Sequence, residues 1–352
     1  MSKLTVIKGD AGPQHRIIEN EFYKIETLPK SGQIWHVWNK LGSNTDWYHK
    51  EWASNYEKRG DPCHWAPNCW VGYPGRVGNG FEFVGGGELD VIDWHYAFGW
   101  DNPETTFEEK DNSFTLTRRG VIPPHPEHTN QAIYRERKPL IWGEVTYEFL
   151  GDKPYFRQSS RLRTLAPVPV FFIRNCQFVF LVRSFTHLLI APDDPSIRAN
   201  DEPDIAILSI MANHDMKPFD QQHSLSNVLP SKLGYTGFLN HDTRDGFALF
   251  QLKEENTNLR TGKPMYANHC TLYSDLKDWA AYFCRAFSYT NQRYNPENMA
   301  CLPEGEEYCE ENVAYLFRHE TFESSRKLLG EKEKEVKAFF NGRPTFMRRR
   351  GR

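Results

Sequence analysis

Alternation of apolar and polar residues dominates the chain and predicts a protein built mainly from β-strands. Between residues 144 and 149, Val145, Tyr147 and Phe149 alternate with polar neighbours. A period of two is typical of a strand with one buried face, because successive side chains point to opposite sides of a sheet. Comparable runs predict further strands at residues 4–7, 16–27, 33–42, 89–100, 111–121, 205–212, 236–240, 246–252, 266–273, 279–286 and 313–318.

The stretch 140–193 predicts an antiparallel meander. Gly151-Asp-Lys-Pro154 has turn chemistry, the chain then returns through residues 155–165, and two further apolar runs extend to Ile190. An arginine-rich strand face is either solvated or meets an anionic ligand, because planar guanidinium groups suit carboxylates. The returning strand presents such a face, formed by Arg157, Ser159, Arg161 and Arg163.

Residues 61–80 contain prolines, glycines and aromatic residues with little alternation, so they predict a long ordered loop that builds a site on the scaffold. Residues 321–340 show a helical period instead, with Thr321 in the position of an N-cap. The basic tail 346–352 is expected to be disordered. Many short strands and one late helix predict an all-β protein, an antiparallel sandwich with residues 1–345 as a single domain.

Composition excludes some classes of function. The formal net charge of −3 argues against a nucleic-acid binder that depends on phosphate contacts, and no apolar run is long enough for a membrane span. Seven cysteines without a regular framework favour a reducing compartment. The first residues lack a signal-peptide pattern, so we expect a cytoplasmic protein, or a secreted one if a signal peptide has been removed. Oligomeric state cannot be predicted.

The opening hairpin resembles a known family. The segments ENEFYKIE, Lys30-Ser-Gly-Gln33 and IWHVWNKLG, together residues 19–42, are similar to the first hairpin of galactose-mutarotase-like β-supersandwich domains. Such domains occur in polysaccharide lyases, glycoside hydrolases and aldose epimerases, so the resemblance implies a supersandwich that acts on carbohydrate. The His-Pro-Tyr and Asn-Gly-Pro signatures of an aldose 1-epimerase are absent from the sequence.

Metal and covalent chemistry have weaker support. Histidine and cysteine ligands occur in two proline-containing segments, but their spacing matches no zinc pattern, so we expect no cofactor. No Gly-x-Ser-x-Gly nucleophile turn is present. The candidate ligands are Cys63, His64, Cys69, His125 and His128.

Two carbohydrate chemistries have eligible residues. Hydrolysis needs two facing carboxylates, for which Asp90, Asp93, Glu144 and Glu306 qualify. Elimination from a uronate instead needs cations or amides to neutralise the carboxylate, a base for the α proton, and an acid for the leaving oxygen.

We predict a lyase that cleaves a uronate-containing glycosidic bond by β-elimination, with an oligosaccharide or glycoside as its substrate. A glycoside hydrolase on the same fold, a sugar epimerase and a non-catalytic carbohydrate-binding protein are the alternatives. His187 lies in an apolar run, which also fits a buried core histidine. The predicted acid–base residues are His64, Tyr73, His187 and His269. The predicted substrate contacts are Trp65, Trp70 and Trp94 for stacking and Arg76, Arg174 and Asn175 for the carboxylate.

Overall fold

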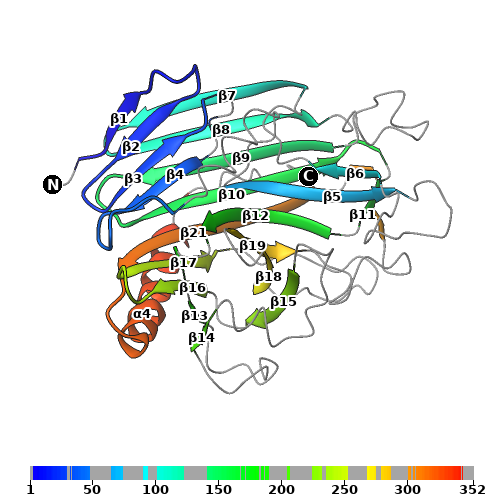
Figure 1. The fold of residues 1–352 in the computed structure, drawn as a ribbon. Helices are drawn as coiled ribbons and strands as arrows, with labels where there is room; N and C mark the ends of the chain where they lie inside the picture. Colours follow the sequence, from blue (N-terminus) through cyan, green and yellow to red (C-terminus); the bar gives the residue numbers. More distant parts are fainter. Residues whose placement is uncertain are drawn as a thin grey trace.

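The computed structural model describes residues 3–29, 32, 34–47, 65–73, 90–93, 101–122, 141–166, 168–170, 172–181, 184–185, 187–189, 204–206, 224–231, 235–252, 268–274, 279–286, 300–302, 304–305, 307–341 and 343. This part of the chain forms two large antiparallel sheets, a small two-stranded sheet and one helix (Figure 1).

The first sheet has ten strands in the described residues and contains both the N-terminal strands and several from the middle of the chain. Its order is β1 (Thr5–Lys8), β2 (Arg16–Glu19), β3 (Tyr23–Thr27), β4 (Ile34–Asn39), β5 (Trp65–Tyr73), β12 (Phe172–Leu181), β19 (Trp279–Ala286), β18 (Asn268–Ser274) and β15 (Ser224–Ser231), with β6 (Asp90–Asp93) paired to β5.

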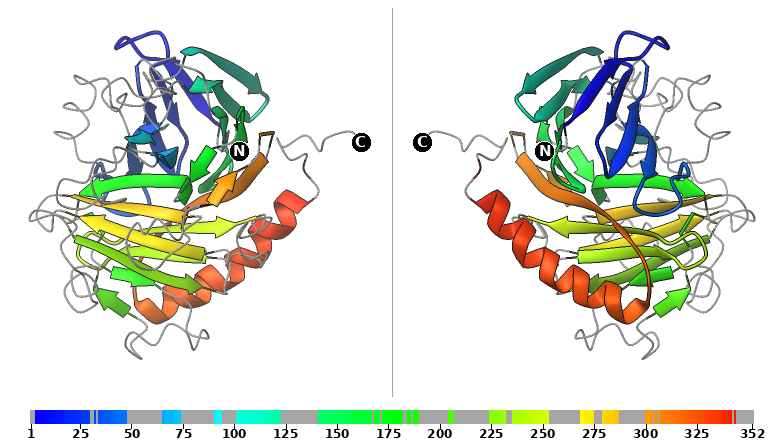
Figure 2. Two further views of the ribbon diagram at one scale, coloured as in Figure 1. Left: turned by 90° about the vertical axis from the view of Figure 1, so that its right-hand side faces the viewer. Right: turned by 90° about the vertical axis from the view of Figure 1, so that its left-hand side faces the viewer.

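The second sheet has nine described strands, and one of its faces is covered by the helix α4 (Phe322–Asn341) (Figure 2). Its order is β14 (Asp204–Ala206), β13 (His187–Leu189), β16 (Tyr235–Asn240), β17 (Asp245–Gln251), β21 (Glu307–Arg318), β10 (Tyr155–Thr164), β9 (Ile141–Leu150), β8 (Ser113–Ile122) and β7 (Asp101–Lys110). The small sheet pairs β11 (Val168–Val170) with β20 (Ala300–Leu302).

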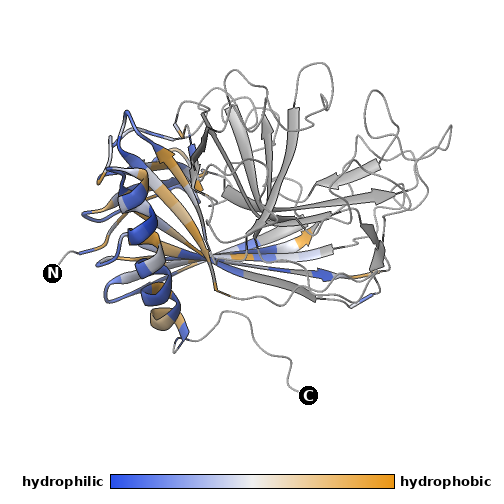
Figure 3. Ribbon diagram, turned by 90° about the horizontal axis from the view of Figure 1, so that it is seen from below, coloured by the Kyte–Doolittle hydropathy of each residue, from blue (hydrophilic) through white to orange (hydrophobic). Residues whose placement is uncertain are grey.

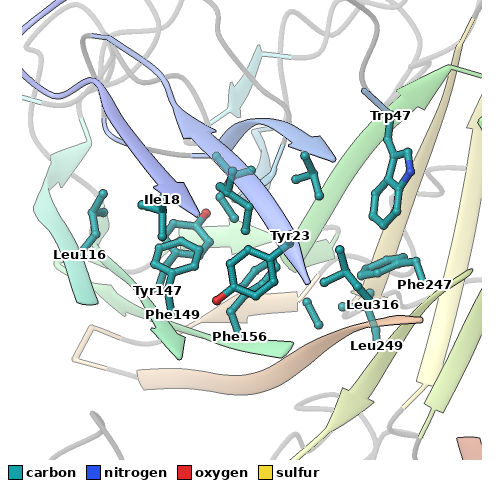
Figure 4. Close-up of a cluster of buried hydrophobic side chains, with 14 of the residues drawn as sticks. Ile18, Tyr23, Trp47, Leu116, Tyr147, Phe149, Phe156, Phe247, Leu249 and Leu316 are labelled. Carbon is teal, nitrogen blue, oxygen red and sulfur yellow. The ribbon is translucent and has the colours of Figure 1, made fainter. Parts of the chain in front are cut away.

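The main hydrophobic core lies between the two large sheets (Figure 4). Tyr23 of the first sheet is fully buried and packs edge-on against Phe156 of the second. Its hydroxyl donates to the carbonyl oxygen of Leu150 (3.0 Å) and accepts from the Leu150 amide (3.2 Å). The same tyrosine therefore joins the sheets through both apolar contact and hydrogen bonds.

A second core fills the space between the nine-stranded sheet and α4. Leu329, Val336 and Phe340 of the helix are buried against tyrosines and phenylalanines of the sheet, and apolar residues are visible on the strands beside α4 (Figure 3). Thr321 caps the helix, because its Oγ1 accepts from the Ser324 amide (3.1 Å). The predicted helix and its cap are confirmed.

The predicted fold class is confirmed: the described chain is mostly antiparallel sheet with one C-terminal helix. The opening hairpin forms with Tyr23 opposite Asn39. The predicted strand 16–27, however, is two strands, β2 and β3. Asn20 separates them, because its Oδ1 accepts from the amides of Phe22 (2.8 Å) and Tyr23 (2.9 Å) and stabilises a tight turn.

The predicted meander is correct only in its first hairpin. β9 and β10 pair with Phe149 opposite Phe156, but β10 has β21 as its other neighbour, and β12 belongs to the first sheet. Alternation tells which face of a strand is buried but not which strand lies beside it. The partner of β10 follows more than 140 residues later in the sequence, as the Tyr155–Tyr315 pair shows.

The predicted loop at 61–80 is wrong for residues 65–73, which form the interior strand β5. Pro67 made a strand look unfavourable, because proline cannot donate to a ladder. In the structure, Ala66 lies opposite Gln177 and Asn68 opposite Arg174, so the register shifts around Pro67. A proline is tolerated at such an irregularity. Strand β7, which also contains a proline, was not predicted at all.

Candidate functional site

The core between the sheets becomes polar along three strands of the nine-stranded sheet. On β10, Phe156 belongs to the core, and Gln158 and Ser160 occupy the next positions on the same face. On β21, Asn312 continues the face that carries Leu316, and on β8 Arg118 continues the face of Leu116. All four polar residues are at most 3% exposed. We call Arg118, Gln158, Ser160 and Asn312 the inner polar layer.

Arg118 is the charged member of this layer. Its side chain donates from Nη1 to Oγ1 of Thr105 on the neighbouring strand (3.2 Å). Burial lowers the pKa of the Arg118 guanidinium to about 10, so the group is still a cation at neutral pH. A desolvated cation gains more from an anionic ligand than an exposed one does, because water screens it less.

The layer also contains groups suited to sugar hydroxyls. Gln158 and Asn312 each have an amide that can donate and accept, and Ser160 has a hydroxyl that does both. Glu310 lies directly opposite Ser160 in the β10–β21 register. Cation, amide, hydroxyl and carboxylate residue types thus occur on β8, β10 and β21 of one sheet.

Strand β12 approaches β10 and β21 from the other sheet. It carries the predicted carboxylate-binding residues Arg174 and Asn175. Asn175 lies within the break in register between β5 and β12. Such irregularities occur often beside active sites, because they redirect the chain locally. The structure therefore places the strand of two predicted site residues across from the strands of the inner polar layer.

The other predicted residues of the first sheet lie on strands close to β12. β5 is its direct neighbour, with Trp70 opposite Phe172, and β18 is separated from it by β19. The strand positions in this group are Trp65, Trp70 and Tyr73 on β5, Arg174 and Asn175 on β12, and His269 on β18. Three predicted site residues, His64, Arg76 and Trp94, lie outside the described residues.

His187 is not brought to this group. It lies on β13 in the nine-stranded sheet, and its ring packs edge-on against Phe322 of α4 with the ring centroids 5.1 Å apart. The apolar run around His187 belongs to the helix-covered side of the protein, which its sequence pattern alone did not reveal.

The predicted arginine face is buried to half-buried, and two of its arginines are held in ion pairs. Arg157 is 2% exposed and pairs with Glu148 (2.8 Å), and Arg161 pairs with Glu144 (3.3 Å). The guanidinium of Arg161 also lies 4.8 Å from the ring centroid of Trp142. Glu144, an eligible hydrolytic acid, is therefore an ion-pair partner on the outer face of the sheet.

Sequence reasoning missed the inner polar layer. The signal was present as a change from apolar to polar residues at every second position, in Phe156-x-Gln158-x-Ser160 and in Asn312-x-Ala314-x-Leu316. The arginines on the opposite face of β10 were the more conspicuous polar residues of this strand, so that face was predicted to meet a ligand. Only the packing of the second sheet shows which face lies inside.

The described residues contain no group of three histidine, cysteine or acidic side chains arranged to hold a metal ion. Among the same residues, no helix is long and apolar enough to cross a membrane.

Comparison with known proteins defines the fold only. No protein-family model and no curated protein matches the chain. Among solved structures, the Slr1438 protein from Synechocystis sp. PCC 6803 is similar, with a TM-score of 0.52, 12% identity, and coverage of 89% of this chain and 98% of that one. At such low identity the likeness shows the fold alone.

Two further similar structures carry a functional name. One is a galactose mutarotase related enzyme from Lactobacillus acidophilus, with a TM-score of 0.48, 11% identity, and coverage of 87% and 98%. The other is a galactose mutarotase-like protein from Lactobacillus casei ATCC 334, with a TM-score of 0.49, 11% identity, and coverage of 86% and 99%.

Proposed function

We propose that the chain is an enzyme that acts on an anionic carbohydrate and cleaves a uronate-containing glycosidic bond by β-elimination. The observation that supports this proposal is the buried guanidinium of Arg118 within a polar layer between two sheets. A cation in that environment favours a ligand with a carboxylate, and the neighbouring amides and hydroxyl suit the hydroxyl groups of a sugar.

The elimination divides its work among three kinds of residue. Arg118, together with Arg174 and Asn175 on β12, would neutralise the carboxylate and so acidify the proton on the adjacent carbon. A base takes that proton, and the released electron pair forms a carbon–carbon double bond. The glycosidic oxygen then leaves with a proton from an acid. The candidates for base and acid are His64, Tyr73 and His269. The fourth predicted residue, His187, packs against Phe322 of α4 and lies apart from this group.

A sugar epimerase is the second candidate. It is favoured by the position of Glu310 opposite Ser160, because a carboxylate beside the inner polar layer could transfer a proton without any bond to a leaving group being broken. Hydrolysis would require a second carboxylate near the same site.

A panel of uronate oligosaccharides separates these reactions. Elimination raises absorbance in the ultraviolet band of the unsaturated uronate, whereas hydrolysis releases reducing ends without that rise. Epimerisation appears as exchange between sugar isomers in NMR spectra. Binding without any of these changes would contradict an enzymatic role.

Arg118→Gln tests the site, and the next residue provides a matched control. Arg119 is exposed, lies on the outer face of the same strand, and pairs with Glu104 (2.7 Å). We expect Arg118→Gln to lower kcat/KM by about 100-fold or more and Arg119→Gln to leave it unchanged. Arg118→Lys, which keeps the charge but not the planar fork, should retain more activity than Arg118→Gln. Full activity in a folded Arg118→Gln protein would show that the inner polar layer is not the site.

A further inference from the structure

Three histidines from three separate elements meet at the beginning of α4. His187 comes from β13, His241 from the turn between β16 and β17, and His319 directly follows β21. All three rings lie around Phe322, the first residue of the helix, with centroid distances of 5.1, 6.1 and 5.3 Å. We call these three residues the histidine cluster.

A hydrogen-bonded chain links the surface to the first turn of the helix through this cluster. His319 is fully buried, and its Nδ1 lies 2.8 Å from Oγ of Ser325, which is 1% exposed. Its Nε2 lies 3.3 Å from Nδ1 of His241, a residue exposed to solvent. In the neutral state one nitrogen of His319 donates and the other accepts, so both contacts are satisfied in either tautomer.

Mostly cationic or potentially cationic groups face His319. His241 and Arg244 belong to the β16–β17 turn, and His187 faces it from β13. Among the described residues, Glu320 is the acidic group that acts in the opposite direction, and its carboxylate is already paired with Arg318 (2.5 Å) and lies 3.5 Å from Arg244. A positive charge on the His319 ring would therefore be poorly compensated by nearby acidic groups.

We propose that the histidine cluster is a pH-sensitive latch that holds the first turn of α4 on the nine-stranded sheet at neutral pH and releases it in acid. When His319 binds a proton, a buried cation stands next to His241, His187 and Arg244. Release of the turn lets water solvate that cation and moves it away from Arg244. The apolar contact of Phe322 with the three rings is lost in the released state.

The expected size of the effect follows from linkage. Burial, then His241, Arg244 and His187, lower the pKa of docked His319 to about 4, whereas a released histidine has a pKa of about 6.5. The released state therefore binds the proton more tightly, and docking weakens as the pH falls from about 6.5 toward 4. Between pH 7 and pH 5, these two pKa values predict that the docking equilibrium constant falls about 20-fold.

Hydrogen exchange at the two pH values measures this directly. After correction for the intrinsic exchange rate, protection of the amides in residues 325–329 should fall about 20-fold from pH 7 to pH 5, whereas protection in β9 and β10 should stay constant. An unchanged protection of α4 in the wild-type protein would overturn the proposal.

Substitutions identify the group that titrates. His319→Gln, which cannot bind a proton in this range, should remove the pH dependence of α4 protection. His241→Gln removes the neighbouring imidazole that lowers the pKa of His319 and should make the fall smaller, and it serves as the test if His319→Gln does not fold. His15→Gln is the control, because His15 is also buried, at 6% exposure, but lies in the N-terminal part of the first sheet. An undiminished fall in folded His319→Gln, or in His241→Gln, would assign the response to other groups.

Discussion

The guanidinium of Arg157 and the carboxylate of Glu148 form a buried ion pair across β9 and β10, with Nη2 2.8 Å from Oε2. Glu311 of β21 lies 3.7 Å from the same guanidinium, and the ring centroid of Phe340 lies 4.9 Å from its central carbon. One cation thus stands between two carboxylates of the sheet and an aromatic ring near the end of α4.

Replacement of Arg157 by Met should destabilise the protein by about 3–5 kcal/mol, because it removes the buried cation between Glu148 and Glu311. Glu148 would keep its longer pair with Arg343 (3.4 Å). Urea unfolding of the variant measures this loss. The exposed pair Arg119–Glu104 provides the comparison, and Arg119→Met should cost about 1 kcal/mol or less. Equal losses in the two variants would show that burial does not strengthen the Arg157 pair.

Tyr23→Phe should cost about 1–3 kcal/mol, because it removes the hydroxyl that serves both the amide and the carbonyl of buried Leu150. Tyr155→Phe is a matched control. The hydroxyl of Tyr155 has no hydrogen-bond partner within the described structure, so its loss should be close to neutral. A Tyr23→Phe protein as stable as the control would contradict the bridging role of the Tyr23 hydroxyl.

Stability should fall in alkaline solution above pH 10. Burial raises the pKa of Tyr315 to about 12 and also raises the pKa values of Tyr23 and Tyr155. Unfolded tyrosine ionises near pH 10, so above that pH the unfolded chain is stabilised while the folded tyrosines stay protonated. At pH 11 each should contribute a loss of about 1 kcal/mol. Tyr315→Phe should reduce the difference in unfolding free energy between pH 8 and pH 11; an unreduced difference would exclude Tyr315 as a source.

All seven cysteines should react with a thiol reagent in denaturant without reductant. If a disulfide exists, Cys284 is the first residue to examine, because Cys284 of β19 lies opposite Cys176 of β12 and opposite Cys270 of β18. A count below seven in protein prepared from its native host would contradict the predicted reducing compartment, and peptide mapping would show whether Cys284 is involved.

The sequence was informative where local chemistry decides the structure. The Thr321 cap and the Asp-Lys-Pro turn after Leu150 depend on neighbouring residues, and both elements were predicted. Contacts distant in sequence could not be predicted in this way. Nothing near Phe172 indicates that β12 leaves the sheet of β10 and joins the opposite one, since a run of apolar residues satisfies either sheet.

The candidate site shows the same limit. Arg174 and Asn175 remain predicted carboxylate contacts, and the structure puts their strand across from the inner polar layer. Arg118 was overlooked because Arg118 and Arg119 look equivalent in the sequence. Only the packing of two sheets makes one of them buried and the other exposed.

Strands β10 and β21 pack against α4 on one face and against the first sheet on the other, so the helix contacts the strands that carry the inner polar layer. Tyr155 and Tyr315 lie under α4, while Gln158 and Asn312 on the same two strands belong to the inner polar layer. Because a packed strand moves as a unit, a repacking of the outer side shifts the side chains on the inner side as well. Trimming or redesigning the C-terminal helix would therefore also move the side chains of the inner polar layer, on the far side of the same two strands.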